Sequence, residues 1–123
     1  MILYQAVIVH GLAEARIALA PGLPATLLSG RGAALYAGAG WWREVMAAAR
    51  AAFPGAPMTH LLDCGDAPGR AFEALRLGLP GLVLDALCPA FPEVARAASA
   101  CGALLLDRAP PALDLATPGA GLR

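Results

Sequence analysis

One tripeptide occurs three times at a fixed interval, and it constrains the fold of this 123-residue chain more than any other feature. In each copy two apolar residues precede an aspartate, and the aspartates Asp63, Asp85 and Asp107 stand 22 residues apart. The residues between two copies have the composition of a helix, and such an interval holds one strand, one helix and two short connections. The repeat therefore predicts strands that alternate with helices, which is the pattern of a parallel α/β sheet.

Five segments have the apolar, β-branched character of buried strands. They are residues 2–9, 25–29, 58–63, 81–85 and 103–107. Because parallel strands are joined by right-handed crossovers and are covered by helices, we expect a small doubly wound, mostly parallel five-stranded sheet with helices on both faces. This α/β class has the three-layer architecture of flavodoxin-like and Rossmann-like proteins.

Three helices are expected from apolar residues at helical spacing, with proline near the start or glycine after the end. They cover residues 41–53, 68–77 and 92–101. Residues 12–20 are ambiguous. Their composition favours a helix, but Ile17 and Leu19 could also share one face of a hairpin strand, and both alternatives remain open here.

The length suits one domain that buries its core without disulfides or metals. We expect a single α/β domain over residues 1–107, followed by a proline- and glycine-rich C-terminal tail over residues 108–123. This tail is expected to be extended or loose, although Leu113 and Leu115 could dock against the domain.

The composition limits the possible partners. Hydrophobic residues make up 59% of the chain and charged residues 15%, so few polar side chains are left to cover a small monomer, and a homo-oligomer is expected. The net charge is +0 and the arginines are scattered, so nucleic acid is not expected as a partner. The chain has no lysine, which excludes Schiff-base chemistry on a lysine.

The cysteines and the apolar runs indicate the cellular compartment to expect. Cys64, Cys88 and Cys101 are odd in number and form no disulfide framework, so reduced thiols in the cytoplasm are expected. The first residues lack the pattern of a signal peptide, and no apolar run reaches the length of a membrane span, so no membrane partner is expected.

The candidate site follows from the strands. Ligands of open α/β sheets bind outside the carboxyl ends of the strands, and the chain places many of its few polar groups there. A purely structural reading also exists, since an aspartate is a common residue at the end of a strand and in a turn. The candidate ligand-binding residues are His10, Ser29, Arg31, Asp63, Cys64, Gly65, Asp66 and Asp85, with Cys88 and Arg108 nearby.

Three chemistries are compatible with these residues. The glycine-rich stretch SGRGAALYAGAG and Arg31 could bind an anion, although its spacing is neither a dinucleotide fingerprint nor a Walker A loop. Asp63, Asp66 and Asp85 could offer oxygens to a divalent cation, but no metal site is assigned. Cys64 could be a nucleophile with a histidine as its base, or simply a buried cysteine.

The stretch LLDCGDAPGRAFEAL resembles the first motif of S-adenosylmethionine-dependent methyltransferases, especially RNA-ribose methyltransferases. Asp63, Gly65 and the run Ala67-Pro68-Gly69 match that motif, and the resemblance implies that Asp85 binds the ribose of the cofactor. The chain departs from the family in having too few strands after the motif. It also lacks the lysines of the Lys-Asp-Lys-Glu catalytic set.

The strand count and length also resemble response-regulator receiver domains, with Asp63 in the place of the phosphoacceptor. The first strand, however, ends in His10-Gly11 without an acidic pair, and the last ends in Asp107-Arg108 without a lysine. These departures exclude a working phosphoreceiver.

The sequence thus favours a small α/β module that binds a small anionic ligand at the carboxyl ends of its strands, with no cofactor identified. Asp63 is expected to matter most, because a glycine-containing loop and a helix start follow it. Two alternatives remain. One is a small enzyme that uses these carboxylates with His10, and the other is a structural or assembly subunit without a ligand.

Overall fold

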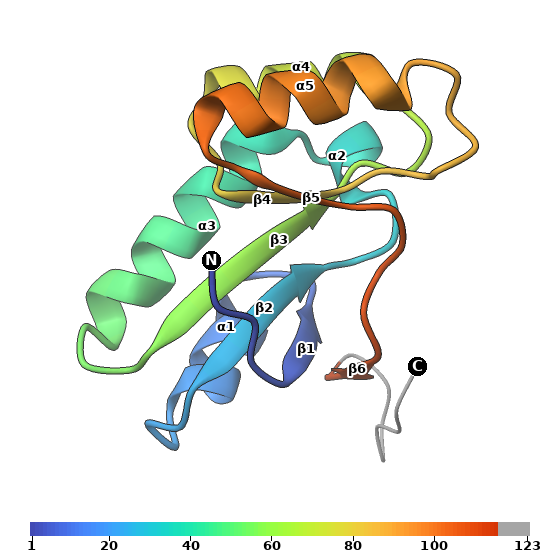
Figure 1. Ribbon diagram of the computed structural model, residues 1–123. Helices are drawn as coiled ribbons and strands as arrows, with labels where there is room; N and C mark the ends of the chain where they lie inside the picture. The colour runs from blue at the N-terminus through green and yellow to red at the C-terminus, as the bar shows by residue number, and fades with distance from the viewer. Residues whose placement is uncertain (116–123) are drawn as a thin grey trace.

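The computed structural model describes residues 1–115, which form one six-stranded parallel sheet and five helices (Figure 1). The strand order is β5-β4-β3-β2-β1-β6, and every pair of neighbours is parallel. The strands are β1 (Ala6–Val9), β2 (Ala25–Ser29), β3 (Met58–Asp63), β4 (Gly81–Val83), β5 (Leu104–Leu106) and β6 (Ala112–Asp114). The predicted α/β class with a parallel sheet is therefore confirmed.

The sheet has six strands where five were predicted. The sixth, β6, lies in the segment that the sequence assigned to the tail, and it pairs with β1 in the register Val7 to Leu113. The sequence did not reveal this strand, because it has only three residues and because the prolines and glycines around it are typical of a loop. Residues 116–123 of the same segment lie outside the described residues.

The first strand is shorter than the predicted residues 2–9. It begins at Ala6, and the backbone N–H of Tyr4 donates instead to the side-chain oxygen of Thr26 at 2.8 Å. The strands β4 and β5 also end before their aspartates, because the chain turns there. The N–H of Asp85, for example, donates to the carbonyl of Gly65 and not to a neighbouring strand.

The ambiguous residues 12–20 form a helix, α1 (Leu12–Leu19). The glycine-rich connection after β2 contains a short helix, α2 (Ala33–Tyr36), that was not predicted. The three predicted helices are present, and none of their ends is shifted by more than two residues. They are α3 (Ala39–Ala52), α4 (Pro68–Arg76) and α5 (Phe91–Cys101).

The helices form a single layer, which differs from the expected arrangement on both faces. The buried residues of all five helices belong to one core cluster, with Trp42, Leu75 and Val94 among them. The cluster on the other face of the sheet contains strand residues only, including Ile8 and Leu61. The strand order explains this, because β1 to β5 follow one another across the sheet, and right-handed crossovers in one direction put every helix on the same side.

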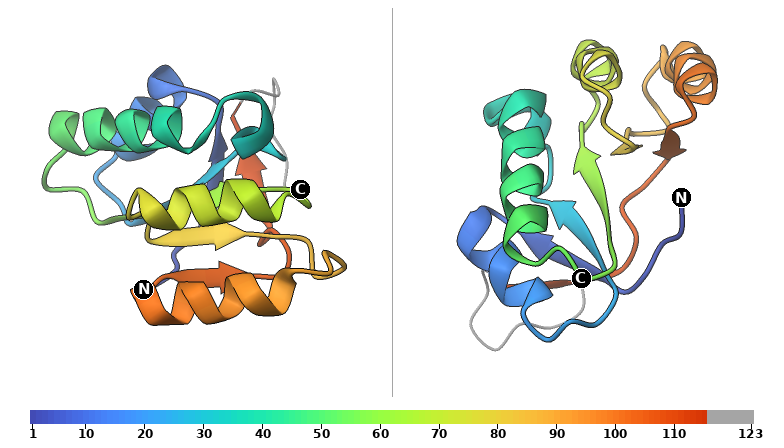
Figure 2. Two further views of the ribbon diagram at one scale, coloured as in Figure 1. Left: turned by 90° about the horizontal axis from the view of Figure 1, so that it is seen from above. Right: turned by 90° about the vertical axis from the view of Figure 1, so that its left-hand side faces the viewer.

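Extended chain covers the second face. Figure 2 shows the N-terminal segment and the connection between β5 and β6 on the side of the sheet that faces away from the helices. Gly81 reveals how closely the N-terminus packs there. A Cβ at this position would stand 2.8 Å from the Met1 side chain and 2.7 Å from that of Leu61.

No helix within residues 1–115 is both long and apolar enough to cross a membrane.

Candidate functional site

A pocket of about 470 Å³ lies at the carboxyl ends of β3, β4 and β5. We call it the rim pocket. Since all strands run the same way, the loops that leave them meet at this edge of the sheet. A hollow of about 290 Å³ adjoins it, shares Arg31, Asp63 and Arg108 with it, and extends to Pro110. The rim pocket is lined by Arg31, Asp63, Gly65, Asp66, Val83, Asp85, Asp107, Arg108 and Ala109.

The three aspartates of the sequence repeat line this one pocket together. The 22-residue interval between them in the sequence is therefore the interval between the ends of successive strands, which lie side by side around this pocket. Arg31 comes from the loop after β2 and Arg108 from the connection after β5, so guanidinium groups enter the pocket from two separate segments. Five of the eight candidate residues reach it, namely Arg31, Asp63, Gly65, Asp66 and Asp85.

Two of these aspartates are held by their own turns. An oxygen of Asp63 accepts the backbone N–H of Gly65 at 2.8 Å, and an oxygen of Asp85 accepts that of Leu87 at 2.9 Å. Such Asx turns explain why an aspartate stands at the end of β3 and another shortly after β4. An ionised carboxylate has two oxygens with about four acceptor sites, so one bond of this kind leaves capacity for a ligand.

Gly65 connects the two turns. Its backbone has φ +58°, a left-handed conformation that glycine adopts without steric cost. In this conformation its N–H reaches Asp63 while its carbonyl accepts the N–H of Asp85 at 2.8 Å. A residue with a side chain at this position would strain the floor of the pocket.

Ser29 does not line the rim pocket, but it forms a hydrogen bond with Asp63, which does. The residue is buried, and its hydroxyl accepts the backbone N–H of Asp63 at 2.8 Å and donates to the carbonyl of Gly30 at 3.2 Å. The first of these bonds ties the end of β2 to the end of β3, and the second is local to the loop after β2. The sequence placed Ser29 correctly at the strand end, but its side chain does not line the pocket.

Cys64 also points away from the pocket. It is fully buried, and its thiol donates weakly to the carbonyl of Leu62 at 3.7 Å. Burial, and after it the neighbouring Asp63 carboxylate, together raise the pKa of Cys64 to about 12. A buried thiol with a raised pKa is a weak nucleophile, so these observations favour the alternative that Cys64 is simply a buried cysteine. All three cysteines are free, as predicted, and of the three only Cys101 is exposed.

His10 lies at the other end of the same edge. Its Nε2 is 3.0 Å from a carboxylate oxygen of Asp114, which joins the end of β1 to the end of β6. A Cβ on Gly30 would stand 2.9 Å from the ring of His10 and 2.8 Å from the Tyr36 hydroxyl, so glycine is needed where these groups meet. His10 does not line the rim pocket, and the enzyme alternative that combined it with the carboxylates has no shared cavity there.

Several residues of the pocket were not among the candidates. Asp107 could have been included, because it is the third copy of the repeat. Arg108, which the sequence placed near the candidate residues, does line the pocket. Val83 and Ala109 are apolar residues with no sequence pattern that marks them as pocket residues. Outside the pocket, the contact of Asp114 with His10 could not be predicted either, because it depends on the sixth strand. Within the described part of the chain, no three His, Cys, Asp or Glu side chains are grouped so that they could hold a metal ion.

No protein-family model matches this chain, and neither does any curated protein.

Proposed function

We propose that the protein binds a small ligand in the rim pocket, and that this ligand carries an anionic group together with several hydroxyl or amino groups. The observation that supports this proposal is the convergence of Arg31 and Arg108 with the repeat aspartates on one cavity. A guanidinium binds phosphate or carboxylate through two parallel hydrogen bonds. A carboxylate accepts hydrogen bonds from hydroxyl and amino groups.

The balance of charge defines the ligand class further. Four aspartates and two arginines line the pocket, so a ligand with negative charge alone would meet an excess of carboxylates. Hydroxyl groups that donate to these carboxylates would remove that conflict. Sugar phosphates and nucleotides combine both features, and a volume of about 470 Å³ is within the range of small-molecule sites.

S-adenosylmethionine is a second candidate, and one observation favours it. Asp63, Gly65 and Asp85, which carry the resemblance to the methyltransferase motif, line a single pocket. The ammonium and sulfonium groups of this molecule would also suit the excess of carboxylates. Binding alone is proposed here, because no residue of the pocket has been assigned a catalytic role.

We also propose that the protein is cytoplasmic and that it forms a homo-oligomer. Three free cysteines support a reducing compartment. Self-association is supported by large apolar side chains at the surface, with Ile2, Leu23 and Leu87 each more than 60% exposed. Sedimentation at micromolar concentration tests the second part, and a single species of 12.4 kDa would contradict it.

The binding experiment is a thermal-shift screen with ribose 5-phosphate, adenosine monophosphate and S-adenosylmethionine, followed by calorimetric titration of any hit. A ligand at 100 times its Kd should stabilise the folded protein by about 2.7 kcal/mol. Arg108→Gln and Asp63→Asn should each weaken binding at least tenfold, about 1.4 kcal/mol. The control is Arg16→Gln, which removes a charge from the exposed face of α1 outside the pocket.

Binding that survives both pocket variants unchanged would overturn the assignment to the rim pocket. So would the absence of binding by all three probes. A preference for S-adenosylmethionine over the two phosphates would favour the second candidate.

A further inference from the structure

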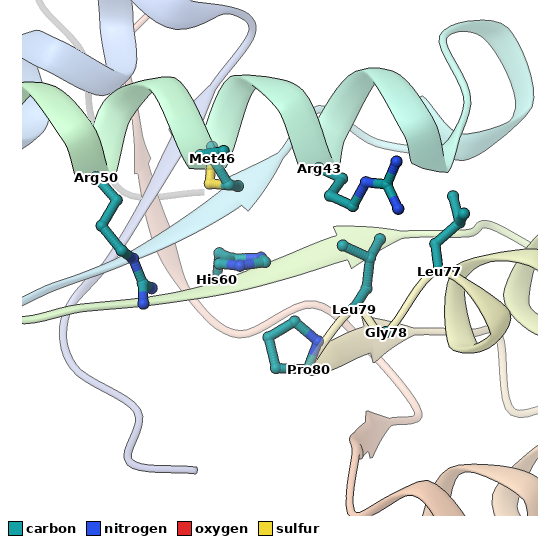
Figure 3. A pocket seen from close by; sticks show the side chains of 9 residues that line it. Arg43, Met46, Arg50, His60, Leu77, Gly78, Leu79 and Pro80 are labelled. Carbon is teal, nitrogen blue, oxygen red and sulfur yellow. The ribbon is translucent and has the colours of Figure 1, made fainter.

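A second cavity, of about 310 Å³, opens between α3 and the turn that joins α4 to β4 (Figure 3). We call it the α3 groove. It lies toward the amino ends of β3 and β4, whereas the rim pocket lies at their carboxyl ends. Its nitrogen groups come from Arg43 and Arg50 on α3 and from His60 on β3. None of the residues that line it is acidic.

His60 offers the groove a hydrogen-bond donor. Its Nδ1 lies 3.2 Å from Nε1 of the buried Trp42, and the two rings meet edge to face. An indole N–H can only donate, so Nδ1 of His60 is the acceptor, and the proton of the neutral imidazole must be on Nε2. No described residue hydrogen-bonds to this Nε2–H, although His60 is only 7% exposed.

The imidazole remains neutral in this position. Burial, and after it the positive charge of Arg50, together lower the pKa of His60 to about 4. The charged groups that line the groove around His60 are Arg43 and Arg50. Their charges disfavour a protonated histidine and favour an anion beside it.

The two arginines stand on one face of α3, separated by two helical turns. This spacing places their Cα atoms about 10 Å apart along the helix axis. Figure 3 shows His60 between them, beneath Met46. Arg50 donates to the carbonyl of Met58 at 3.4 Å, and Arg43 meets Glu44 only at 3.7 Å on the surface, so both retain donors for a ligand.

We propose that the α3 groove binds an elongated small organic dianion. One acidic group would meet Arg43 and the other Arg50, and an oxygen of the ligand would accept the Nε2–H of His60. The aliphatic part between the acidic groups would contact the apolar lining, which includes Met46 and Leu79. In Figure 3 the two arginine side chains lie on either side of His60, which favours a ligand with two separated acidic groups over one compact anion.

The test uses nuclear magnetic resonance of the two histidines that the chain contains. Nitrogen-15-labelled protein is titrated with adipate, a six-carbon dicarboxylate, and the imidazole nitrogens are observed. We expect a saturable shift of the His60 signals while those of His10 stay in place. Butyrate, which carries one carboxylate, should bind at least tenfold more weakly. His60→Gln assigns the signals.

Variants on the groove separate this site from a general attraction of anions. Arg43→Gln and Arg50→Gln should each raise the Kd for adipate at least tenfold. The matched control is Arg96→Gln, which removes an equally charged side chain from the exposed surface of α5. It should leave the Kd unchanged. Circular dichroism confirms that each variant is folded, and Arg43 is half-exposed, so its loss is compatible with folding.

Three results would overturn the proposal. One is a shift of His60 that rises linearly without saturation with adipate, glutarate and pyrophosphate alike. Another is butyrate binding as tightly as adipate. The third is an unchanged Kd in Arg43→Gln. None of these results bears on the rim pocket, whose ligand is tested separately with its own variants.

Discussion

The rim pocket and the α3 groove place charged groups by different means. In the rim pocket, carboxylates stand at or shortly after the carboxyl ends of strands, and backbone N–H groups of their own turns hold two of them. In the α3 groove, a histidine inside a strand is held by the side chain of a tryptophan on a helix. Groups of the first kind depend on local chain geometry, while those of the second depend on how a helix lies over the sheet.

This difference has an energetic side. A turn that uses a carboxylate oxygen keeps its hydrogen bond when an amide oxygen replaces it. The groove depends on Trp42, which is fully buried and belongs to the core. Changes at the rim should therefore separate binding from stability, whereas changes beneath the groove should affect both.

The largest effect is expected for Trp42→Ala. Removal of this buried side chain should lower the free energy of unfolding by about 3–5 kcal/mol, because it leaves a cavity and an unpaired Nδ1 on His60. Trp42→Phe keeps most of the volume and should cost about 1 kcal/mol, close to the value of one hydrogen bond. Urea unfolding measures both. A loss below about 1 kcal/mol for Trp42→Ala would show that this core does not depend on Trp42.

The reactivities of two cysteines allow a comparison between the buried loop after β3 and the protein surface. Cys64 is buried, and its pKa is raised to about 12, whereas Cys101 is exposed. A disulfide reagent at pH 8 should therefore modify Cys101 at least a hundredfold faster than Cys64 in the native protein. Cysteine-to-serine variants assign the rates, and denaturant should equalise them. Rapid modification of native Cys64 would mean that the loop after β3 opens readily.

The lowered pKa of His60 leads us to expect that the stability of the protein depends on pH. Its folded pKa of about 4 lies below the ordinary value of 6.5, so the unfolded chain binds more protons between these values. The stability due to neutral His60 is complete above pH 6.5 and is lost as the pH falls toward 4. Between pH 6.5 and pH 5 the loss should be about 2 kcal/mol.

His60→Gln is the control for this prediction, since glutamine does not titrate. The difference between the unfolding curves of wild type and variant isolates the contribution of His60 from that of every other titratable group. A difference that stays constant from pH 7 to pH 5 would contradict a buried neutral His60.

The smallest effect is expected at Asp63. Asp63→Ala removes the acceptor of the Gly65 N–H and should cost about 1 kcal/mol of unfolding free energy. Asp63→Asn retains an oxygen in the same place and should cost less than about 0.5 kcal/mol. Thermal and urea unfolding of the two variants measure this difference. Equal losses would mean that the charge, and not the turn, stabilises the end of β3.

The rim was largely predictable because its signals are local. A change from apolar to polar residues marks the end of a strand, and a fixed interval between such changes places Asp63, Asp85 and Asp107 on one edge of a parallel sheet. The pattern does not specify which way a side chain turns at that edge. Ser29 and Cys64 stand at the correct ends of strands, yet their hydrogen bonds direct them into the interior.

The α3 groove could not be predicted because it depends on lateral packing. His60 is one residue in an apolar strand, and nothing in the spacing of Arg43 and Arg50 connects them with it. Their meeting requires the position of α3 over β3. The sixth strand escaped prediction for a related reason, since a three-residue strand is stabilised by its partner β1 more than by its own composition.

The path of the chain from β5 to β6 has a consequence for synthesis on the ribosome. Each of the strands β2 to β5 pairs with its predecessor, so the sheet can grow in the order in which the chain emerges. The segment that carries Arg108 and Ala109 comes later. Its end is anchored where Asp114 meets His10, across 104 residues of chain. A nascent chain therefore forms most of its sheet before its rim pocket is complete. Binding of a ligand to the rim pocket would then show that residues 107–114 have been synthesised and have packed against the sheet.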